Sequence, residues 1–130
     1  MTQSGTPPRI LLAEDIAINR KVVVVSLKSL GVTIDIAENG AEAVEKFEEN
    51  AYDLVLMDIM MPIKNGIEAA IEIRRIEKEG SRDDTPIIAM TASPSSDVQT
   101  QCTTAGMNEF MPKPFNPSDL RDAVKRYLTR

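Results

Sequence analysis

The run Leu54-Val55-Leu56-Met57-Asp58 is the clearest indication of the fold of this chain. Four apolar residues in an unbroken run, followed at once by a carboxylate, are typical of a parallel strand that is buried on both faces of a sheet. The next residues, 59–66, contain a proline and end in Asn65-Gly66, which predicts a loop that leads into a helix before Gly80. This unit of strand, loop and helix is the pattern with which the rest of the chain can be compared.

The pattern recurs along the sequence. Short apolar runs predict the other strands at 10–13, 32–37, 86–90 and 109–111. Apolar residues at helical spacing predict helices over 18–30, 40–50, 67–79 and 117–127, and we expect a polar helix over 97–105. Strands that alternate with helices predict an α/β domain: a doubly wound, mostly parallel five-stranded sheet with helices on both faces. In the first helix, we expect one sheet-facing side to hold Val22, Val23, Leu27 and Leu30.

The composition fits one globular domain. The chain has 130 residues, of which 42% are hydrophobic and 27% charged, and we expect a flexible N-terminal lead over 1–8 and one domain over 9–130. The net charge of −5 leaves no basic excess, which argues against direct binding to nucleic acid. No apolar run reaches the roughly 18 residues of a membrane span, and the first residues lack the apolar centre of a secretory signal. We therefore expect no membrane association and a cytoplasmic location.

Histidine is absent and cysteine occurs once, which restricts the chemistry of the chain. The usual zinc ligand sets cannot be assembled, and the chain can neither carry phosphate on imidazole nor use a histidine base. We interpret Cys102 as a packing residue. A metal site would need oxygen ligands, and any reaction would rest on carboxylates, lysine and hydroxyl groups.

Polar side chains directly follow several of the predicted strands. They are Glu14 and Asp15 after the first strand, Asp58 after the third, Thr91 after the fourth and Lys113 after the fifth. Taken singly, such acids are most often helix caps or solvated loop charges. Because the carboxyl ends of parallel strands meet at one edge of a sheet, we expect these side chains to converge. Three carboxylates in one crevice repel one another unless a cation is present, so the sequence predicts a Mg²⁺ site.

Asp58 is the candidate nucleophile because it ends the central and most apolar strand. A carboxylate can attack phosphorus and form an acyl phosphate. The Thr91 hydroxyl, the Ala92 backbone N–H and the Lys113 ammonium would then neutralise the oxygens of the transferring phosphoryl group. Together these residues predict a phosphoryl-transfer site.

Five short motifs, taken together and in order, resemble one family. They are Glu14-Asp15, Leu56-Met57-Asp58-Ile59-Met60-Met61-Pro62, Asn65-Gly66, Thr91-Ala92 and Lys113-Pro114-Phe115. With each motif at a strand end, the chain resembles the receiver domain of two-component response regulators, similar to the bacterial chemotaxis regulator, over residues 9–128. The stretches Leu12-Ala13-Glu14-Asp15 and 106–110 look more like receivers of hybrid histidine kinases. The resemblance implies a flavodoxin-like (βα)5 fold with strand order 2-1-3-4-5.

The resemblance also implies how the site is used. It makes Asp58 the acceptor of a phosphoryl group from a partner's phosphohistidine, so the expected partner is a histidine kinase or a histidine phosphotransfer protein. It implies that Mg²⁺ is held by Asp15, Asp58, the Met60 backbone carbonyl and, through water, Glu14. The chain would then be a phosphorylation-controlled signalling switch and not an enzyme.

Two residues stand at the family's switch positions. They are Thr91 and Phe110, the latter where the family often has tyrosine. The resemblance implies that phosphorylation changes the face formed by the fourth helix, the fifth strand and the fifth helix, which regulates a partner or an attached output. The same face could join two copies in a homodimer. A cis Lys113–Pro114 peptide bond is also implied.

Two other classes of protein share parts of this pattern. An aspartate-nucleophile phosphohydrolase of the haloacid-dehalogenase type needs a second acid two residues after the nucleophile, where this chain has Met60. A flavodoxin-like flavin carrier needs a loop rich in Ser, Thr and Gly after the first strand, where this chain has Glu14-Asp15. Acids in that loop would repel a flavin phosphate.

Overall fold

The computed structural model describes residues 7–92 and 95–128, so most of the predicted lead over 1–8 lies outside the described residues. Within these ranges, strands and α-helices alternate: β1 (Arg9–Ala13), α1 (Ala17–Leu27), β2 (Thr33–Ala37), α2 (Gly40–Glu49), β3 (Leu54–Asp58), α3 (Gly66–Glu79), β4 (Ile87–Thr91), α4 (Ser96–Thr104), β5 (Glu109–Pro112) and α5 (Pro117–Leu128). None of the helices in the described part is long and apolar enough to cross a bilayer.

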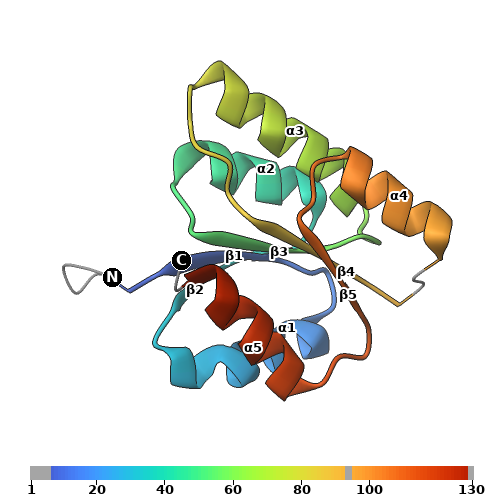
Figure 1. Cartoon of the computed structure of the whole chain (residues 1–130). Helices are drawn as coiled ribbons and strands as arrows, with labels where there is room; N and C mark the ends of the chain where they lie inside the picture. Colours follow the sequence, from blue (N-terminus) through green and yellow to red (C-terminus); the bar gives the residue numbers. More distant parts are fainter. Residues whose placement is uncertain (1–6, 93–94, 129–130) are drawn as a thin grey trace.

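The strands form one parallel sheet in the order β2-β1-β3-β4-β5, so the predicted fold class and strand order are confirmed. Figure 1 shows α1 and α5 on one face of the sheet and α2, α3 and α4 on the other. In the strand register, Asp58 lies beside Met90 and Thr91 beside Pro112. The carboxyl ends of the strands therefore meet at one edge, as expected.

Strand β3 is buried along its whole length because helices cover both faces of the sheet. Its side chains alternate between two apolar layers. Val55 and Met57 belong to the layer under α2, α3 and α4, whereas Leu54 and Leu56 belong to the layer that α1 and α5 cover. Interiors packed in this way leave little freedom of movement, so Asp58 projects from a rigid element.

Helix α1 differs from the prediction in its length and in the side that it buries. The α-helix ends at Leu27, and a 3-10 turn continues the chain to Gly31, whose φ is 66°. Val23 is 1% exposed but Val22 is 40% exposed, so the prediction that both face the sheet is wrong for Val22. Successive helical residues point about 100° apart, and a run of four valines has no polar residue to mark its outer face.

Helix α3 begins so close to β3 that only glycine fits there. A Cβ on Gly66 would lie 2.1 Å from the Asp58 carbonyl oxygen, whereas the nearest atom to a Cβ on Gly80, at the other end of α3, would be 3.3 Å away. We predict that Gly66→Ala lowers the free energy of unfolding by about 2 kcal/mol. Gly80→Ala should change it by less than about 1 kcal/mol. Urea denaturation checks the pair, and equal effects would contradict the close packing of α3 on β3.

Candidate functional site

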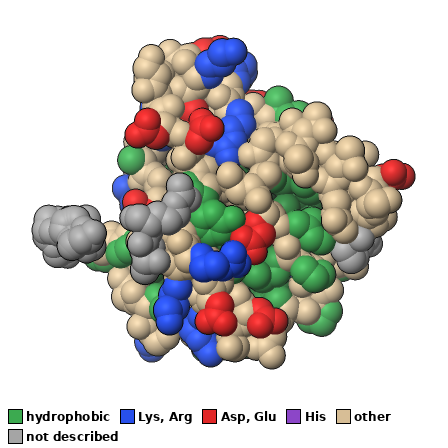
Figure 2. All heavy atoms as spheres, in the orientation of Figure 1, with side chains coloured by type: hydrophobic (Ala, Val, Ile, Leu, Met, Phe, Trp, Pro, Cys, Tyr) green, Lys and Arg blue, Asp and Glu red, His purple; other side chains and the backbone are tan. Residues whose placement is uncertain are grey.

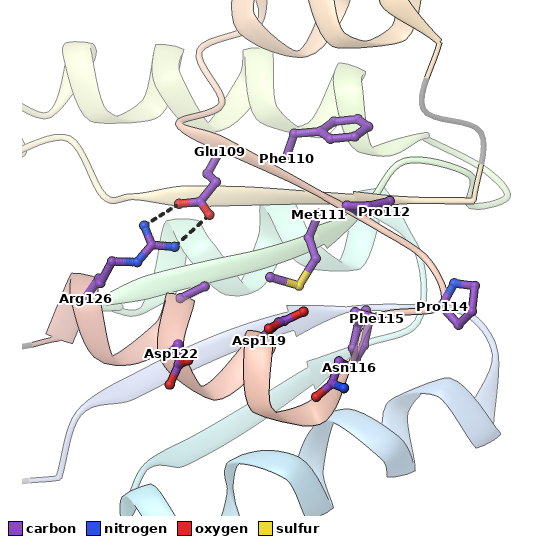
Figure 3. A pocket seen from close by; sticks show the side chains of 11 residues that line it. Glu109, Phe110, Met111, Pro112, Pro114, Phe115, Asn116, Asp119, Asp122 and Arg126 are labelled. Atoms are coloured by element: carbon purple, nitrogen blue, oxygen red, sulfur yellow. Dashed lines mark hydrogen bonds and ion pairs between the residues drawn. The ribbon is translucent and has the colours of Figure 1, made fainter.

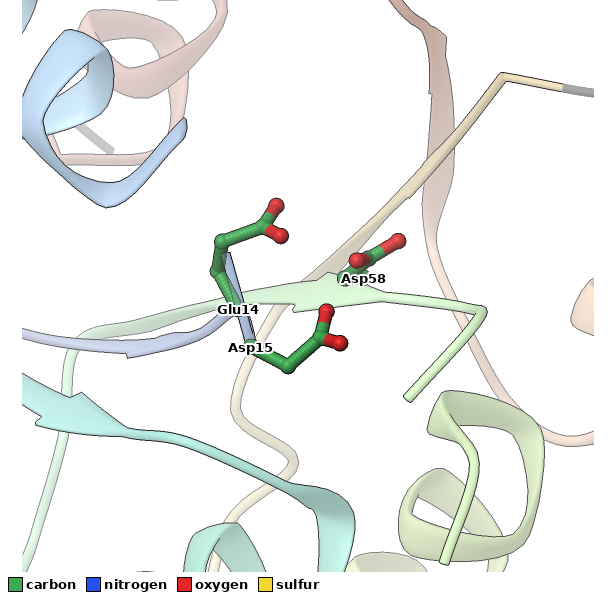
Figure 4. A group of neighbouring side chains, drawn as sticks. All are labelled: Glu14, Asp15 and Asp58. Carbon is green, nitrogen blue, oxygen red and sulfur yellow. The ribbon is translucent and has the colours of Figure 1, made fainter. Parts of the chain in front are cut away.

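Three carboxylates meet at the carboxyl edge of the sheet (Figure 4). Glu14 and Asp15 follow β1 and Asp58 ends β3, and one oxygen of each side chain lies within 4.8 Å of the others. Glu14 is 1% exposed and Asp58 is 3% exposed. Because β1 and β3 are neighbours in the sheet, the fold itself brings the acids together, as their positions after the strands predicted.

Lys113 supplies positive charge to this acidic cluster. Its Nζ lies 2.9 Å from Glu14 Oε1 and 3.3 Å from Asp58 Oδ2. The Lys113 backbone N–H donates to the Thr91 carbonyl oxygen at 2.7 Å, and the Lys113–Pro114 peptide bond is cis, as the resemblance implies. Burial on its own lowers the pKa of Lys113, but its bond to Glu14 and the charge of Asp58 raise that pKa overall. The side chain therefore remains an ammonium.

One ammonium does not balance three carboxylates. Burial, and next the charge of Glu14, raise the pKa of Asp58 to about 6, although the charge of Lys113 opposes the rise. The ionised form of Asp58 is therefore unfavourable in the folded chain. Additional positive charge beside Asp58 would remove this cost.

Asp15 provides a separate observation that points to a metal ion. Its Oδ1 is buried and accepts no hydrogen bond from any group in the described part of the chain. A buried polar atom without a partner costs free energy, and a hard divalent cation with oxygen ligands would satisfy it. A set of carboxylates without histidine or cysteine fits such an ion. The residues present could therefore hold a metal ion.

A pocket opens over Asp58. Of the predicted site residues, its lining includes Asp58, Met60, Ala92 and Lys113. The Met60 N–H points to Asp58 Oδ1 at a long distance of 3.4 Å. Thr91 lies at the buried end of β4, and Phe110 is a half-buried residue of β5, both outside this lining. The structure thus gathers Asp58, Ala92 and Lys113 at one pocket, whereas Thr91 and Phe110 do not line it.

The remainder of the pocket lining was not predicted from the sequence. It consists of Ile16, Asn19, Val22, Pro114 and Phe115. Phe115 belongs to the Lys113-Pro114-Phe115 motif, but no role was predicted for it. The run of valines did not indicate that Val22 faces outward. Most of these side chains are apolar, so the pocket that contains Asp58 is lined largely by apolar residues.

The sequence matches the family model described as "Response regulator receiver domain" over residues 10–125. The chain belongs to this family. It is therefore a phosphoacceptor switch domain of two-component phosphorelays, and not an enzyme by itself. This confirms the resemblance and decides against the phosphohydrolase and flavin-carrier alternatives.

Two curated relatives are histidine kinases. Hybrid signal transduction histidine kinase B of Dictyostelium discoideum is 40% identical over 129 residues, which cover 92% of this chain and 7% of the relative. Histidine kinase 5 of Arabidopsis thaliana is 36% identical over 144 residues, which cover 93% of this chain and 16% of the relative. The chain thus spans only a small part of the length of these relatives.

Solved receiver domains have the same fold. One, from a sensor histidine kinase of Pseudomonas aeruginosa, has a magnesium ion coordinated in its active-site cleft; it is 33% identical with a TM-score of 0.83, covering 96% of this chain and 100% of that one. Another is the receiver domain of Saccharomyces cerevisiae Ssk1, crystallised with the histidine phosphotransfer protein Ypd1. It is 30% identical with a TM-score of 0.87, covering 93% of this chain and 88% of that one.

The raised pKa of Asp58 predicts a pH dependence of folding. A carboxyl group whose pKa rises from 3.8 to about 6 takes up a proton on folding between these two pH values. The Asp58 carboxyl group therefore does not destabilise the fold below about pH 4, and its destabilising effect is complete above about pH 6. Without metal ion, Asp58→Asn should therefore raise the free energy of unfolding by about 3 kcal/mol at about pH 7, and hardly at about pH 4.

Urea denaturation in the presence of a chelator, at the two pH values, measures this difference. Asp83→Asn is the matched control because Asp83 is an exposed aspartate. An equal gain for Asp58→Asn at both pH values, or a larger gain at the lower one, would contradict the raised pKa.

Proposed function

We propose that residues 9–130 act as one receiver domain in which Asp58 accepts the phosphoryl group. The observation that carries this proposal is the burial of Asp58 at the end of β3, with the Lys113 Nζ 3.3 Å away and an open pocket above it. An Asp58 carboxylate oxygen attacks phosphorus, the phosphorus–nitrogen bond of the donor's phosphohistidine breaks, and the imidazole leaves with the bonding electron pair. Lys113 remains protonated and stabilises the negative charge of the group in transfer.

The acidic cluster would hold Mg²⁺ through Asp15, Asp58 and the Met60 carbonyl, with Glu14 reached through water. A bound ion would screen the carboxylates and the phosphoryl oxygens from one another. The best support is the buried Asp15 Oδ1, which has no hydrogen-bond partner in the described residues. The magnesium ion in the cleft of the Pseudomonas aeruginosa receiver domain supports the same choice of metal.

The end of β4 would bind the phosphoryl oxygens and transmit the change. Ala92 lines the pocket, so its N–H can donate to a phosphoryl oxygen, and the Thr91 hydroxyl would turn toward the same group. The Lys113 N–H donates to the Thr91 carbonyl oxygen, so a shift at Thr91 reaches the chain that leaves β5. We propose this backbone bond as one link between the site and β5.

The face formed by α4, β5 and α5 would meet the partner or the output that the switch controls. Hydrophobic side chains gather over β5, between α4 and α5 (Figure 2). A groove follows β5 and α5, and the Glu109–Arg126 ion pair, at 2.9 Å, lies along it (Figure 3). Phe110 and Met111 point to opposite sides of β5, toward the two apolar layers. A homodimer through this face stays a prediction.

A phosphohistidine donor would lie outside these 130 residues, because they contain no histidine. We propose a histidine kinase or a histidine phosphotransfer protein. The crystal of the Ssk1 receiver domain with Ypd1 supports the second class. The expected cytoplasmic location, and the absence of nucleic-acid and membrane binding, stay predictions.

We predict that Asp58 is the single phosphorylation site and that labelling needs Mg²⁺. Incubation with acetyl phosphate and Mg²⁺ should add one base-labile phosphoryl group, because one carboxylate in the pocket lies beside the ammonium. Intact-mass spectrometry measures the addition. Asp58→Asn and a chelator should each abolish it, whereas Asp83→Asn, at an exposed aspartate, should not. Undiminished labelling of Asp58→Asn would overturn the proposal.

We further predict that phosphorylation buries Phe110. If Thr91 moves toward the phosphoryl group, it vacates space that an apolar ring fills favourably, because voids forfeit packing contacts. Phe110 is half-buried against the layer under α4 in this structure. Aromatic NMR with and without beryllofluoride and Mg²⁺ should show slower ring flips and new contacts in the mimic-bound state. An unchanged Phe110 environment would mean that it is a static core residue.

A further inference from the structure

An arginine of α1 holds the peptide group between the two acids that follow β1. Arg20 Nη1 donates to the Glu14 carbonyl oxygen at 3.0 Å. The Glu14 N–H donates to the Ala37 carbonyl oxygen, at the end of β2, at 3.0 Å. The Glu14 carbonyl belongs to the planar peptide group that continues to the Asp15 nitrogen. A rotation of this peptide group would therefore change the direction in which the Asp15 side chain leaves the chain.

The Arg20 side chain is mostly buried and has two partners. It is 20% exposed, and its Nη2 lies 3.8 Å from Glu38 Oε2. The Glu38 side chain is 66% exposed, and ion pairs at the surface contribute little. A charged donor makes a stronger hydrogen bond to a carbonyl oxygen than a neutral donor does. We therefore regard the Glu14 carbonyl as the main partner of Arg20.

The two acids differ in how their side chains are satisfied. Glu14 Oε1 accepts a hydrogen bond from Lys113 Nζ at 2.9 Å, and Oε2 accepts one from the Ile16 N–H at 3.3 Å. Asp15 Oδ1, in contrast, is buried and has no hydrogen-bond partner among the residues that the structure describes. Figure 4 shows the two side chains leaving the chain in different directions. The position of Asp15 is therefore the one that an added ion would depend on most.

We propose that Arg20 is a positioning residue of the metal site: by holding the Glu14 carbonyl, it keeps Asp15 directed at Asp58 and so increases the affinity for Mg²⁺. This inference rests on the proposed metal site. Arg20 does not line the pocket over Asp58, so it acts only through the acids. Groups that orient the ligands of a metal ion typically change its affinity by about 10- to 100-fold when they are mutated.

The sign of the effect separates positioning from charge. Arg20 is a cation close to an acidic cluster, so its charge alone would repel a divalent ion, and its removal would strengthen metal binding. Loss of positioning has the opposite effect, because Asp15 would then be held less firmly in the orientation that binds the ion. A fall in affinity on removal of Arg20 therefore cannot come from its charge.

A Mn²⁺ titration, with the free ion measured by electron paramagnetic resonance, tests this proposal without any phosphoryl transfer. Arg20→Met removes the donor and the charge, and we expect the dissociation constant to rise about tenfold. Arg20→Lys keeps the charge and one donor, so its constant should lie between the two. Lys21→Met is the matched control, because Lys21 is an exposed cation at the next position of α1. It should leave the constant unchanged or lower it slightly.

Phosphorylation by acetyl phosphate at varied Mg²⁺ provides a second measurement. For Arg20→Met, the Mg²⁺ concentration at half-maximal rate should rise about tenfold. The rate at saturating Mg²⁺ should stay within about twofold, because Asp58 and Lys113 are unchanged. Should Arg20→Met fail to fold, Arg20→Lys alone decides, since a rise in its dissociation constant cannot come from a loss of charge.

The other outcomes overturn stated parts. A dissociation constant for Mn²⁺ that is unchanged or lower in the Arg20 variants would contradict the positioning role. A lower rate at saturating Mg²⁺ with unchanged Mn²⁺ affinity would mean that Arg20 acts on the transfer step, and the proposal would again be wrong. If the unmodified chain binds no Mn²⁺, the proposed metal site is wrong and the role of Arg20 falls with it. If it binds Mn²⁺ but accepts no phosphoryl group, only the phosphoacceptor proposal fails.

Discussion

Three carboxylates and one ammonium share a buried edge of the sheet, and the functional features of the chain depend on keeping them together. Glu14, Asp15 and Asp58 repel one another, and Lys113 neutralises only part of their charge. The apolar layers on both faces of β3 offset this repulsion by holding the strand ends at a fixed spacing. The site is therefore poised to respond to added positive charge, and through it to a phosphoryl group.

Lys113 connects the charged site to the end of β4 and to strand β5 at the edge of the sheet. Its ammonium contacts Glu14 and Asp58, while its backbone N–H donates to Thr91 at the end of β4. Strand β5 lies at the edge of the sheet with β4 as its neighbour, so it is less constrained than the central strands. We therefore propose that a change of charge at Asp58 alters β5 and its residue Phe110 without disrupting the core.

The features that depend on apolar runs and on where strands end could be predicted from the sequence. The side to which a particular side chain points, and the backbone conformation of a particular loop residue, could not. Glu14 and Asp58 converge because parallel strands end at one edge, which the pattern reveals. The strand order came from the resemblance, since periodicity does not specify which strands are neighbours. The exposure of Val22 was not predicted, because a run of valines contains no polar residue to show which side of the helix faces solvent. Likewise, nothing about isoleucine at residue 63 indicates a positive φ, which only the packing of the loop against Gly40 imposes.

We propose that a divalent cation completes the acidic cluster and offsets the repulsion around Asp58. A crystal structure of the chain grown with Mn²⁺, with the ion located by its anomalous scattering, tests this proposal. We expect one ion bound by Asp15 Oδ1, by an Asp58 oxygen and by the Met60 carbonyl, with Lys113 still beside Asp58. An ion bound elsewhere, or an acidic cluster that excludes Mn²⁺ while Lys113 alone contacts the carboxylates, would contradict the account.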